Sequence, residues 1–304
     1  MLLVTGASGF LGSTFLREAA AAGRSLVTAS SRSMCAPGVR AVSADLTRPG
    51  AAQELVNDIG PAWVVNCAAL ANVDECERDP VRAHLVNAEL PRALASACAA
   101  SGAGLVHIST DSVFDGRSGG YREEDEPGPL NVYASSKLEG ERAVSDAFPA
   151  ALVVRTNFIG VSRSRRAGLA DWITSELAAS RRIAGFTDVI FAPLLVNNLS
   201  RILLSMMDAG LEGLYHAAAR DACSKYEFAC MIADAVRSDR ALVDRAGLES
   251  AKLAAARPLD TSLSPRRLEA ALGLSMPSVA SAVERYAAMH AASGAAAPHP
   301  SRAG

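Results

Sequence analysis

A tyrosine and a lysine four residues apart, Tyr133 and Lys137, form the feature of the sequence best suited to chemistry. Only three of the 30 basic residues are lysines, which suggests that this position needs an ammonium and not a guanidinium. Residues four apart share one face of a helix, and a nearby ammonium lowers a tyrosine pKa from about 10 by stabilising the phenolate. The pair predicts a proton donor, Tyr133, assisted by Lys137; a surface helix that happened to keep a lysine is the alternative.

A hydroxyl group that could complete such a site lies in "HISTDSVFDG" (107–116), where Ser109, Thr110 and Asp111 end an apolar, strand-like run. Thr110 and Tyr133 could both hydrogen-bond one carbonyl oxygen while a hydride arrives at its carbon. The compact ammonium of Lys137 could also hydrogen-bond a nicotinamide ribose, a double role that suits a planar guanidinium less well.

A hydride donor is suggested by "TGASGFLG" (5–12), which follows the first apolar run and opens a helical segment. In this context Gly6 allows a tight turn, Gly9 lets the backbone approach a pyrophosphate, and Gly12 lets the helix pack closely on the sheet. The free N–H groups and dipole at the start of a helix favour that anion. We therefore expect a dinucleotide-binding loop here.

Residues at the end of the second strand determine the choice between NADP and NAD. Here "ASSRS" (29–33) contains Ser31 and Arg32 and no acidic residue. An arginine can clamp a 2′-phosphate through two N–H groups, so NADP(H) is the preferred cofactor and NAD(H) the alternative. A solvated loop arginine is the competing interpretation of Arg32. Asp45, after the expected third strand, is placed to accept a hydrogen bond from the adenine amino group, with Leu46 beside the ring.

The elements that must position these residues follow an α/β pattern. Apolar, strand-like runs at 2–6, 25–30, 62–69, 104–110 and 151–156 alternate with helical segments at 10–22, 51–59, 81–101 and 133–148. Such alternation predicts a Rossmann-type, doubly wound parallel sheet with helices on both faces. We expect an NADP-binding domain over 1–160, a smaller mixed α/β substrate lobe over 161–291 at the carboxyl ends of the strands, and a disordered tail over 292–304.

The composition excludes several other classes of protein. The 304 residues are half apolar and one-fifth charged, with a formal charge of −2, which is unlike a nucleic-acid binder. We expect no membrane span and no signal peptide. The six cysteines form no CxxC pair and the histidines show no ligand-like spacing, so we expect no metal site and a reduced, cytoplasmic protein. His107, within a strand, is interpreted as a core residue and not as a catalyst.

Taken together, these motifs resemble an extended short-chain dehydrogenase/reductase, and within that group the dTDP-4-dehydrorhamnose reductase (RmlD-like) family. The resemblance runs from residue 2 to about 290 and rests on "TGASGFLG", "VVNCAALANVDECE" (64–77), "HISTDSVFDG", "YREEDEPGPLNVYASSKLEGE" (121–141), "VVRTNFIG" (153–160) and "RPLDTSL" (257–263). It implies catalytic roles for Thr110, Tyr133 and Lys137, and NAD(P)H-dependent reduction of the 4-keto group of a nucleotide-linked deoxysugar.

The full set of predicted site residues extends beyond the catalytic three. Contacts to the cofactor are expected from Gly6, Ser8, Gly9, Phe10, Leu11, Ser31, Arg32, Asp45, Leu46, Cys67, Ala68, Ala69, Tyr133, Lys137 and Ile159. Contacts to the substrate are expected from Val73, Asp111, Ser112, Asn157, Phe158 and Arg257, the last with its diphosphate. Asn87 resembles the asparagine that braces the active-site strand from a neighbouring helix in this superfamily.

Three departures from the family pattern fall on the substrate side. Ser112 stands where the family usually has a tyrosine, and Asn157 and Phe158 replace a tryptophan. The segment "DVIFAPL" (188–194) keeps only the Asp and the Pro of the usual pattern. The resemblance therefore predicts the cofactor and the hydride chemistry but does not define the sugar.

Two other functions stay open. "GLYHAAARDACSKYEFACMIADAV" (213–236) is similar to the regulatory β subunit of methionine adenosyltransferase, which implies a non-catalytic, NADP-binding regulatory subunit as an alternative. In that stretch Ser224 is interpreted as the N-cap of an amphipathic helix. A sugar-nucleotide epimerase or dehydratase is the second alternative, although a dehydratase would need an acid pair beside Thr110, and Asp111 is followed by Ser112. A homodimer is one assembly compatible with the pattern.

Overall fold

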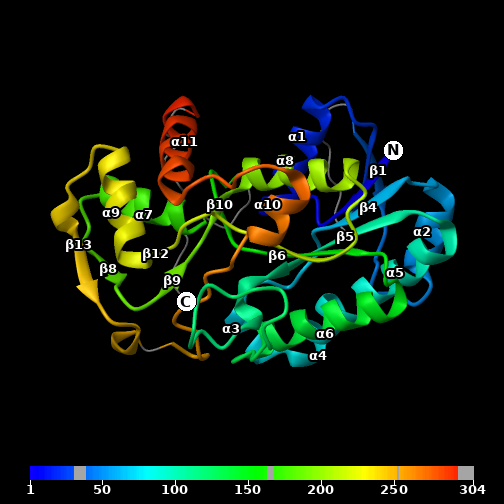
Figure 1. The fold of residues 1–304 in the computed structure, drawn as a ribbon, viewed down its shortest axis with the longest axis horizontal. Helices are drawn as coiled ribbons and strands as arrows, with labels where there is room; N and C mark the ends of the chain where they lie inside the picture. The colour runs from blue at the N-terminus through cyan, green and yellow to red at the C-terminus, as the bar shows by residue number, and fades with distance from the viewer. Residues whose placement is uncertain (31–38, 163–167, 252, 294–304) are drawn as a thin grey trace.

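The computed structural model describes residues 1–30, 39–162, 168–251 and 253–293. Ser31 and Arg32 lie outside the described residues, as does the predicted tail from residue 294 onward. Figure 1 shows a wide body built on the central sheet and a smaller lobe at one end, which contains α7, α9, β8 and β13.

A seven-stranded parallel sheet forms the body, with the strand order β11-β6-β5-β4-β1-β2-β3. Its strands are β1 (Leu2–Thr5), β2 (Leu26–Ser30), β3 (Arg40–Ser43), β4 (Trp63–Asn66), β5 (Gly104–Thr110), β6 (Leu152–Thr156) and β11 (Gly213–Ala217). The strand order reverses between β1 and β4, and a crevice at the carboxyl ends of these strands is where such sheets bind ligands. The predicted doubly wound α/β fold is confirmed.

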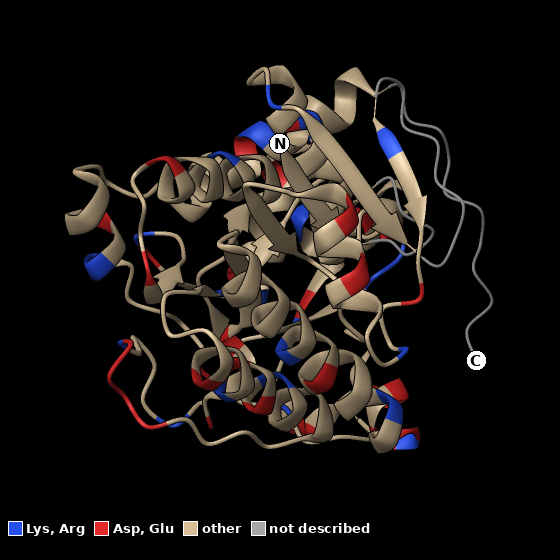
Figure 2. Cartoon of the chain, turned by 90° about the vertical axis from the view of Figure 1, so that its right-hand side faces the viewer, with Lys and Arg blue, Asp and Glu red and all other residues tan. Residues whose placement is uncertain are grey.

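Helices cover both faces of the sheet, as Figure 2 shows. On one face α1 (Phe10–Ala21) packs against α8 (Val196–Asp208), and on the other α2 (Ala51–Ile59), α5 (Leu90–Ser101) and α6 (Val132–Ala147) lie side by side. Each face encloses its own hydrophobic cluster, with Phe15 at the centre of the first and Leu94 in the second. The inner strands are largely apolar because both of their faces are buried, whereas the edge strand β3 is mostly exposed.

The predicted helix over 81–101 is interrupted. It consists of α4 (Pro80–His84), a π-helical turn (Leu85–Glu89) and α5. Pro91 explains the interruption, because it has no N–H to donate to the carbonyl of Asn87 four residues earlier. The π turn accommodates this loss and carries Asn87.

The smaller lobe is built from short pieces around α7 (Leu169–Ala178), α9 (Lys225–Ala235) and α11 (Val279–Ala292). Two-stranded sheets pair β8 (Ile183–Phe186) with β13 (Val243–Ala246), β9 (Ile190–Phe191) with β12 (Cys223–Ser224), and β7 (Phe158–Ile159) with β10 (Leu194–Leu195). The short helices α3 (Val73–Arg78) and α10 (Arg266–Leu272), with 3₁₀ turns at Asp111–Val113, Arg240–Leu242 and Leu248–Ser250, complete the described structure.

The sheet does not end at residue 160, where the sequence places the domain boundary. Strand β11, which we expected in the substrate lobe, pairs in parallel with β6 and extends the central sheet. Helix α8 also belongs to the body, through its contact with α1. A short apolar run such as "GLYHA" fits a strand in either place, and only the pairing decides between them.

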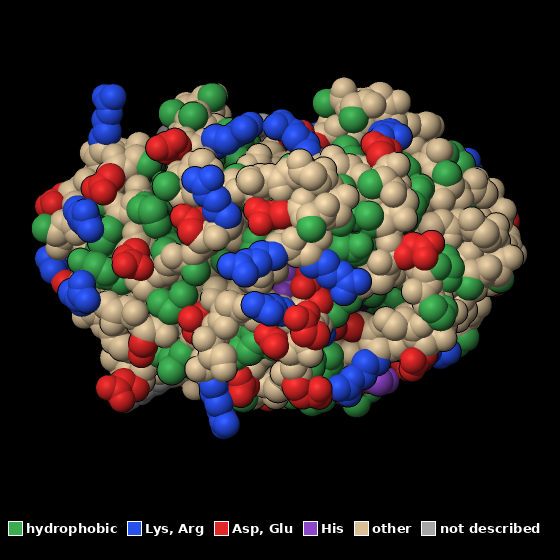
Figure 3. Space-filling view, viewed as in Figure 1, with side chains coloured by type: hydrophobic (Ala, Val, Ile, Leu, Met, Phe, Trp, Pro, Cys, Tyr) green, Lys and Arg blue, Asp and Glu red, His purple; other side chains and the backbone are tan. Residues whose placement is uncertain are grey.

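On the face shown in Figure 3, acidic and basic side chains are interspersed over the body and the lobe. Within the described ranges, no helix is both long enough and apolar enough to traverse a bilayer.

Candidate active site

Helix α6 carries Tyr133 and Lys137, and its first turn is held on two sides. Asn131 caps the helix by accepting the N–H of Ala134 at 2.9 Å, and its own amide donates to the carbonyl of Ala256 at 3.0 Å. The N–H of Val132 donates to Glu77 at the end of α3 at 2.9 Å. Tyr133 is therefore placed by an anchored helix start and not by a free loop.

One turn beyond Lys137, a buried ion pair joins α6 to the sheet. The Arg155 guanidinium, on β6, donates to both carboxylate oxygens of Glu141 at 2.7–3.0 Å, and the Ser109 hydroxyl, on β5, donates to the same carboxylate. All three side chains are buried. Because these contacts connect α6 to β5 and β6, they set the position of Tyr133 and Lys137 relative to Thr110.

Three predicted residues converge on the carboxylate of Asp111, at the carboxyl end of β5. One oxygen accepts the hydroxyls of Thr110 at 3.1 Å and Ser112 at 3.2 Å, and the other accepts the amide of Asn157 at 2.7 Å. The hydroxyl of Thr261 donates to the second oxygen at 2.8 Å, a contact that the sequence did not predict. Asp111 thus joins β5 to the end of β6 and to the C-terminal segment, and it orients the Thr110 hydroxyl.

The pKa of Tyr133 moves in the direction opposite to the expected one. Although part of the ring is exposed, its dense protein surroundings raise the pKa of Tyr133 to about 12, and a hydrogen bond with Thr110 offsets only part of that rise. The neighbouring Asp111 raises it further. The phenol is therefore protonated at neutral pH, as a proton donor must be, and it is adjacent to Thr110 as predicted.

Lys137 is buried and directed toward the sheet. Its ammonium donates to the carbonyl of Ile108 at 2.7 Å and lies 3.5 Å from Nε2 of His107. Burial lowers the pKa of Lys137 to about 8, opposed by the negative charge of Glu141. With a pKa of about 8, Lys137 is uncharged at the pH where Tyr133 ionises, so it does not lower the pKa of the phenol.

The glycine loop has the features that a bound pyrophosphate requires. Gly6 has φ +66°, and a Cβ there would lie 2.5 Å from the backbone of Cys67 and Ala68, while a Cβ at Gly12 would lie 2.4 Å from the Gly6 carbonyl. Helix α1 begins without a side-chain cap and without an acid in its first turn. Its first N–H groups are therefore available to an anion, so the residues present fit a dinucleotide.

The other predicted cofactor residues surround this loop in different ways. Phe10 meets Phe158 edge to face, with ring centroids 5.6 Å apart, so a predicted cofactor contact and a predicted substrate contact adjoin each other. Asp45 follows β3 as expected, is exposed, and uses one carboxylate oxygen to cap the Thr47 N–H at 3.0 Å. Ser8 is exposed. The segment directly after β4 contains Cys67, Ala68 and Ala69. Three other predicted cofactor residues have side chains buried in the core: Leu11, Leu46 and Ile159.

Arg257, in the C-terminal segment, reaches α3. Its Nη2 donates to Asp74 at 3.2 Å, next to the predicted substrate residue Val73, although the two residues are 183 apart in sequence. Nη1 of Arg257 is buried without a hydrogen-bond partner. A buried, unpaired guanidinium nitrogen fits the predicted contact to a diphosphate.

Lys225 is a functional candidate that the sequence analysis missed. Ser224 caps α9 as predicted, in a full capping box with Glu227, but the next residue places its ammonium 3.0 Å from the centroid of the Phe191 ring. Burial lowers the pKa of Lys225 to about 8, and the charge of Asp111 opposes that shift. The signal was available, since Lys225 is one of only three lysines in the chain.

Asn87 braces the site as the resemblance implies. Its side chain accepts the Leu70 N–H at 2.8 Å and donates to the Leu70 carbonyl at 3.1 Å and to Ser136 at 3.0 Å. It therefore connects the segment after β4 to the helix of Tyr133 and Lys137.

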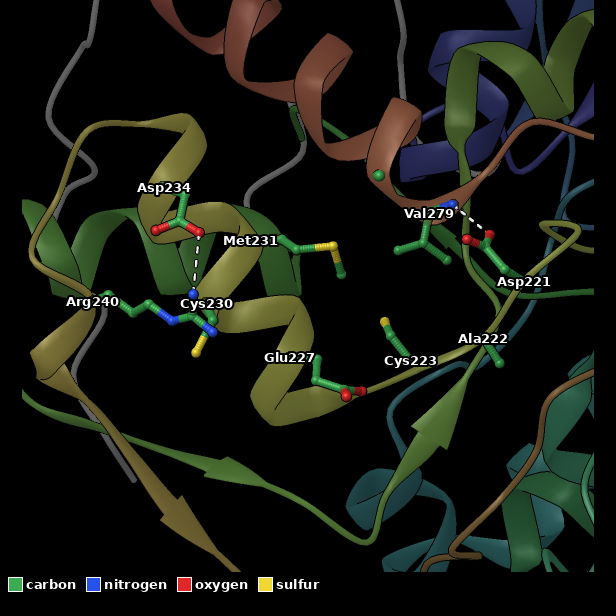
Figure 4. Close-up of a pocket in the computed structure, with 10 residues that line it drawn as sticks. Asp221, Ala222, Cys223, Glu227, Cys230, Met231, Asp234, Arg240 and Val279 are labelled. Carbon is green, nitrogen blue, oxygen red and sulfur yellow. Dashed lines mark hydrogen bonds and ion pairs between the residues drawn. The ribbon is translucent and has the colours of Figure 1, made fainter.

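A separate pocket of about 360 Å³ lies in the smaller lobe (Figure 4). It is lined by Cys223, Cys230, Met231 and charged residues of α9 and its neighbours, among them Arg240 beside Asp234. None of the predicted site residues lines it. Among the residues that the structure describes, no group of three acidic, histidine or cysteine side chains is arranged to hold a metal ion.

The order of the strands, the glycine loop after β1, and a Thr, Tyr and Lys meeting at the strand ends define an extended short-chain dehydrogenase/reductase. Within that class, the sequence profile of the RmlD substrate-binding domain matches residues 1–291, and the chain belongs to this family.

Known relatives include both reductases and a regulatory subunit. The chain is 34% identical to a probable low-salt glycan biosynthesis reductase of Haloferax volcanii, over 91% of this chain and 93% of the relative. It is 36% identical to a dTDP-4-dehydrorhamnose reductase of Mycobacterium tuberculosis, over 87% and 81%. It is 31% identical to the methionine adenosyltransferase 2 subunit beta of Pongo abelii, over 88% and 81%. Both resemblances predicted from the sequence are thus confirmed.

Solved structures agree with this assignment. A dTDP-4-dehydrorhamnose reductase of Clostridium acetobutylicum superposes with a TM-score of 0.83 at 27% identity, covering 95% of this chain and 98% of that one. The enzyme of Bacillus anthracis, solved in complex with NADP, superposes with a TM-score of 0.82 at 28% identity, covering 94% and 97%.

Proposed function

We propose that the protein is an NADPH-dependent reductase of a keto group on a nucleotide-activated deoxysugar, similar to dTDP-4-dehydrorhamnose reductase. The observation that carries the proposal is the arrangement of Thr110 against the Tyr133 phenol, with Lys137 one turn along the same helix, beside an uncapped glycine loop. The relatives named as reductases support the same substrate class.

A nicotinamide cofactor, when bound, would supply a hydride for the carbonyl carbon. As substrate binds, Thr110 turns its single hydroxyl proton from Asp111 to the carbonyl oxygen. Tyr133 hydrogen-bonds the same oxygen and gives it the phenol proton as the alcohol forms. Lys137 holds the ribose of the cofactor and, in its charged form, stabilises the phenolate that Tyr133 leaves. Arg257 and the segment at Val73 bind the diphosphate at the outer end of the cleft.

The direct test is a screen of purified protein with NADPH against a panel of dTDP-, UDP- and GDP-keto-sugars, following cofactor oxidation. Stoichiometric oxidation with one of them supports a reductase. Turnover of a sugar nucleotide without net oxidation would instead indicate an epimerase or a dehydratase that recycles its cofactor.

Cofactor preference has its own test, since Arg32 lies outside the described residues. A charge-assisted contact to the 2′-phosphate is worth about 1.5–3 kcal/mol, or roughly ten- to a hundredfold in affinity. Arg32→Ala should therefore lower the ratio of NADPH to NADH affinity by that factor, measured by fluorescence titration. Arg40→Ala, at an exposed position of β3, is the matched control and should leave the ratio unchanged. An unchanged ratio in Arg32→Ala would contradict the assignment.

The second candidate function is a regulatory, NADP-binding subunit, favoured by the 31% identity to the methionine adenosyltransferase 2 subunit beta. If NADPH binds but no keto-sugar is reduced, this function gains support, and capture with a purified methionine adenosyltransferase catalytic subunit becomes the deciding measurement.

A further inference from the structure

A row of polar side chains crosses the interior of the sheet and ends at Lys137. Thr5, Asn66 and His107 occupy the same register position on the adjacent strands β1, β4 and β5. These three side chains and Lys137 are each at most 2% exposed. Polar groups buried this deeply must satisfy one another, so the direction of every hydrogen bond in the row matters.

The direction of the row is set by a backbone N–H. The N–H of Ala68, which can only donate, reaches Oδ1 of Asn66 at 3.2 Å, and the Thr5 hydroxyl donates to the same oxygen at 2.6 Å. This orients the Asn66 side chain and leaves its NH₂ group facing Nδ1 of His107 at 3.1 Å. Nδ1 must therefore accept.

The tautomer of His107 follows from this contact. A neutral imidazole with an accepting Nδ1 carries its proton on Nε2. Burial and the neighbouring Lys137 keep the pKa of His107 well below its ordinary value, so the ring is neutral. Its Nε2–H points toward Nζ of Lys137, 3.5 Å away.

Only one protonation form of Lys137 can use this donor. A neutral amine has a lone pair that can accept the Nε2–H. An ammonium has three N–H donors and no lone pair, so it cannot accept this hydrogen bond. Either form can donate to the Ile108 carbonyl at 2.7 Å. The row from Thr5 to His107 thus favours the neutral amine.

We propose that His107 is a positioning residue that holds its Nε2–H toward Lys137 and so sets the pH above which Lys137 no longer binds the cofactor ribose as an ammonium. The proposal rests on the ribose-binding role of Lys137 in the proposed function.

The other titratable groups to consider around Lys137 are Tyr133, Glu141 and Cys67, and Tyr133 is an uncharged phenol in this pH range because its pKa is about 12. Glu141, on the same helix, favours the ammonium and opposes His107. Cys67, after β4, would act in the same sense as Glu141, but burial raises its pKa to about 12, so it is an uncharged thiol in the relevant range. Burial, opposed by Glu141, places the pKa of Lys137 at about 8. A hydrogen bond from the His107 Nε2–H to the amine therefore acts in the neutral to mildly alkaline range.

The first test is the tautomer itself, observed by ¹⁵N NMR of the wild-type protein without cofactor between pH 6.5 and 10. We expect His107, identified by its loss in the His107→Gln spectrum, to be protonated on Nε2, and its Nε2 shift to change as Lys137 titrates. An Nδ1-protonated ring at these pH values would overturn the proposal.

The second test reverses the direction of the hydrogen bond between residue 66 and Nδ1 of His107. In Asn66→Asp a carboxylate oxygen faces Nδ1, which moves the ring proton to Nδ1 and leaves Nε2 as an acceptor for the Lys137 ammonium. The alkaline limit of NADPH binding, followed by fluorescence titration, should then rise by about one pH unit or more, as expected for a reversed hydrogen bond near a new charge. His216→Gln, at a buried histidine on β11, is the control and should leave the limit in place. An unchanged or lowered limit in Asn66→Asp would refute the role of His107.

Neither test uses a keto-sugar, so the two proposals fail separately. If the protein reduces a keto-sugar but His107 is protonated on Nδ1, the proposed function holds and the role proposed for His107 is wrong. A protein that reduces no keto-sugar loses the proposed function, while the tautomer and the pH dependence of NADPH binding still decide the role of His107. The wild-type tautomer measurement also keeps the inference testable if Asn66→Asp does not fold.

Discussion

The single hydroxyl of Tyr133 separates a catalyst from a binding protein. Tyr133→Phe removes one oxygen and keeps the ring, so NADPH affinity should change little. Turnover of the keto-sugar found in the screen should fall by about 10² to 10⁴, the range for losing a positioned general acid. Binding by fluorescence titration and steady-state kinetics measure the two effects. Equal turnover in the wild type and the variant would assign the proton transfer to another group.

Lys137 should act in both binding and turnover. Lys137→Ala is expected to weaken NADPH binding and to lower kcat, because the same ammonium holds the ribose and stabilises the phenolate. Lys137→Arg should not restore activity, since the buried space beside Ile108 and His107 accommodates a compact ammonium and not a planar guanidinium. The measurement is kcat and NADPH affinity for both variants, and recovery in Lys137→Arg would contradict this account.

At the same scale, the sequence predicted the identity of the reactive residues better than their electrostatics. Spacing and a strand-end location were enough to predict that Thr110 lies beside Tyr133, with Lys137 one turn further along the helix, and their catalytic roles stay predictions. The expected fall in the Tyr133 pKa was wrong for the protein without cofactor, because burial raises the pKa of the phenol and Lys137 has lost its charge at the pH where Tyr133 ionises. The spacing of Tyr133 and Lys137 contains no information on how deeply they are buried or where their side chains point. Thr261 was missed because its contact with Asp111 joins residues 150 apart in sequence.

Helix α6 depends on one buried ion pair for its place on the sheet. Arg155→Met should leave the Glu141 carboxylate buried without its partner and cost about 3–5 kcal/mol of unfolding free energy, measured by urea denaturation. Arg182→Met breaks the exposed pair with Asp244 and should cost no more than about 1 kcal/mol. Similar losses in the two variants would mean that the buried pair is not what holds the helix.

Helices and strands were the most predictable part of the molecule. Strand β5 and helix α2 have the predicted bounds, because strong apolar periodicity and turn residues define them locally. The π turn at Leu85–Glu89 was not foreseen, although Pro91 was visible, since a proline can end, kink or merely adjust a helix. The pairing of β11 with β6 was missed because it depends on contacts 61 residues apart.

For the molecule as a whole, buried histidines should make stability depend on pH. Burial and the nearby Arg155 lower the pKa of His216 to about 3, against an ordinary value of about 6.5 in the unfolded chain. Between those values the unfolded state binds more protons, so stability is lost as the pH falls from 6.5 toward 3.

The expected size is about 1 kcal/mol of unfolding free energy per buried histidine between pH 7 and 5.5. Urea denaturation at the two pH values measures this difference. In His216→Gln the loss of unfolding free energy between the two pH values should be smaller by the contribution of one buried histidine. A wild-type protein equally stable at both pH values would contradict the assignment of His216 and His107 as neutral, buried groups.

The placement of β11 bears on how such a protein can be altered by recombination. The chain leaves the sheet after β6, forms part of the lobe, returns for α8 and β11, and then leaves again. A crossover at residue 160 that joined this sheet to the second half of a relative would also replace the strand that covers the open edge of β6. The smaller lobe therefore cannot be exchanged as one continuous segment, because its chain enters and leaves the sheet more than once. If the proposed function is right, changing the substrate by point substitution around Asp111 and Asn157 should disturb the sheet less than exchanging the lobe.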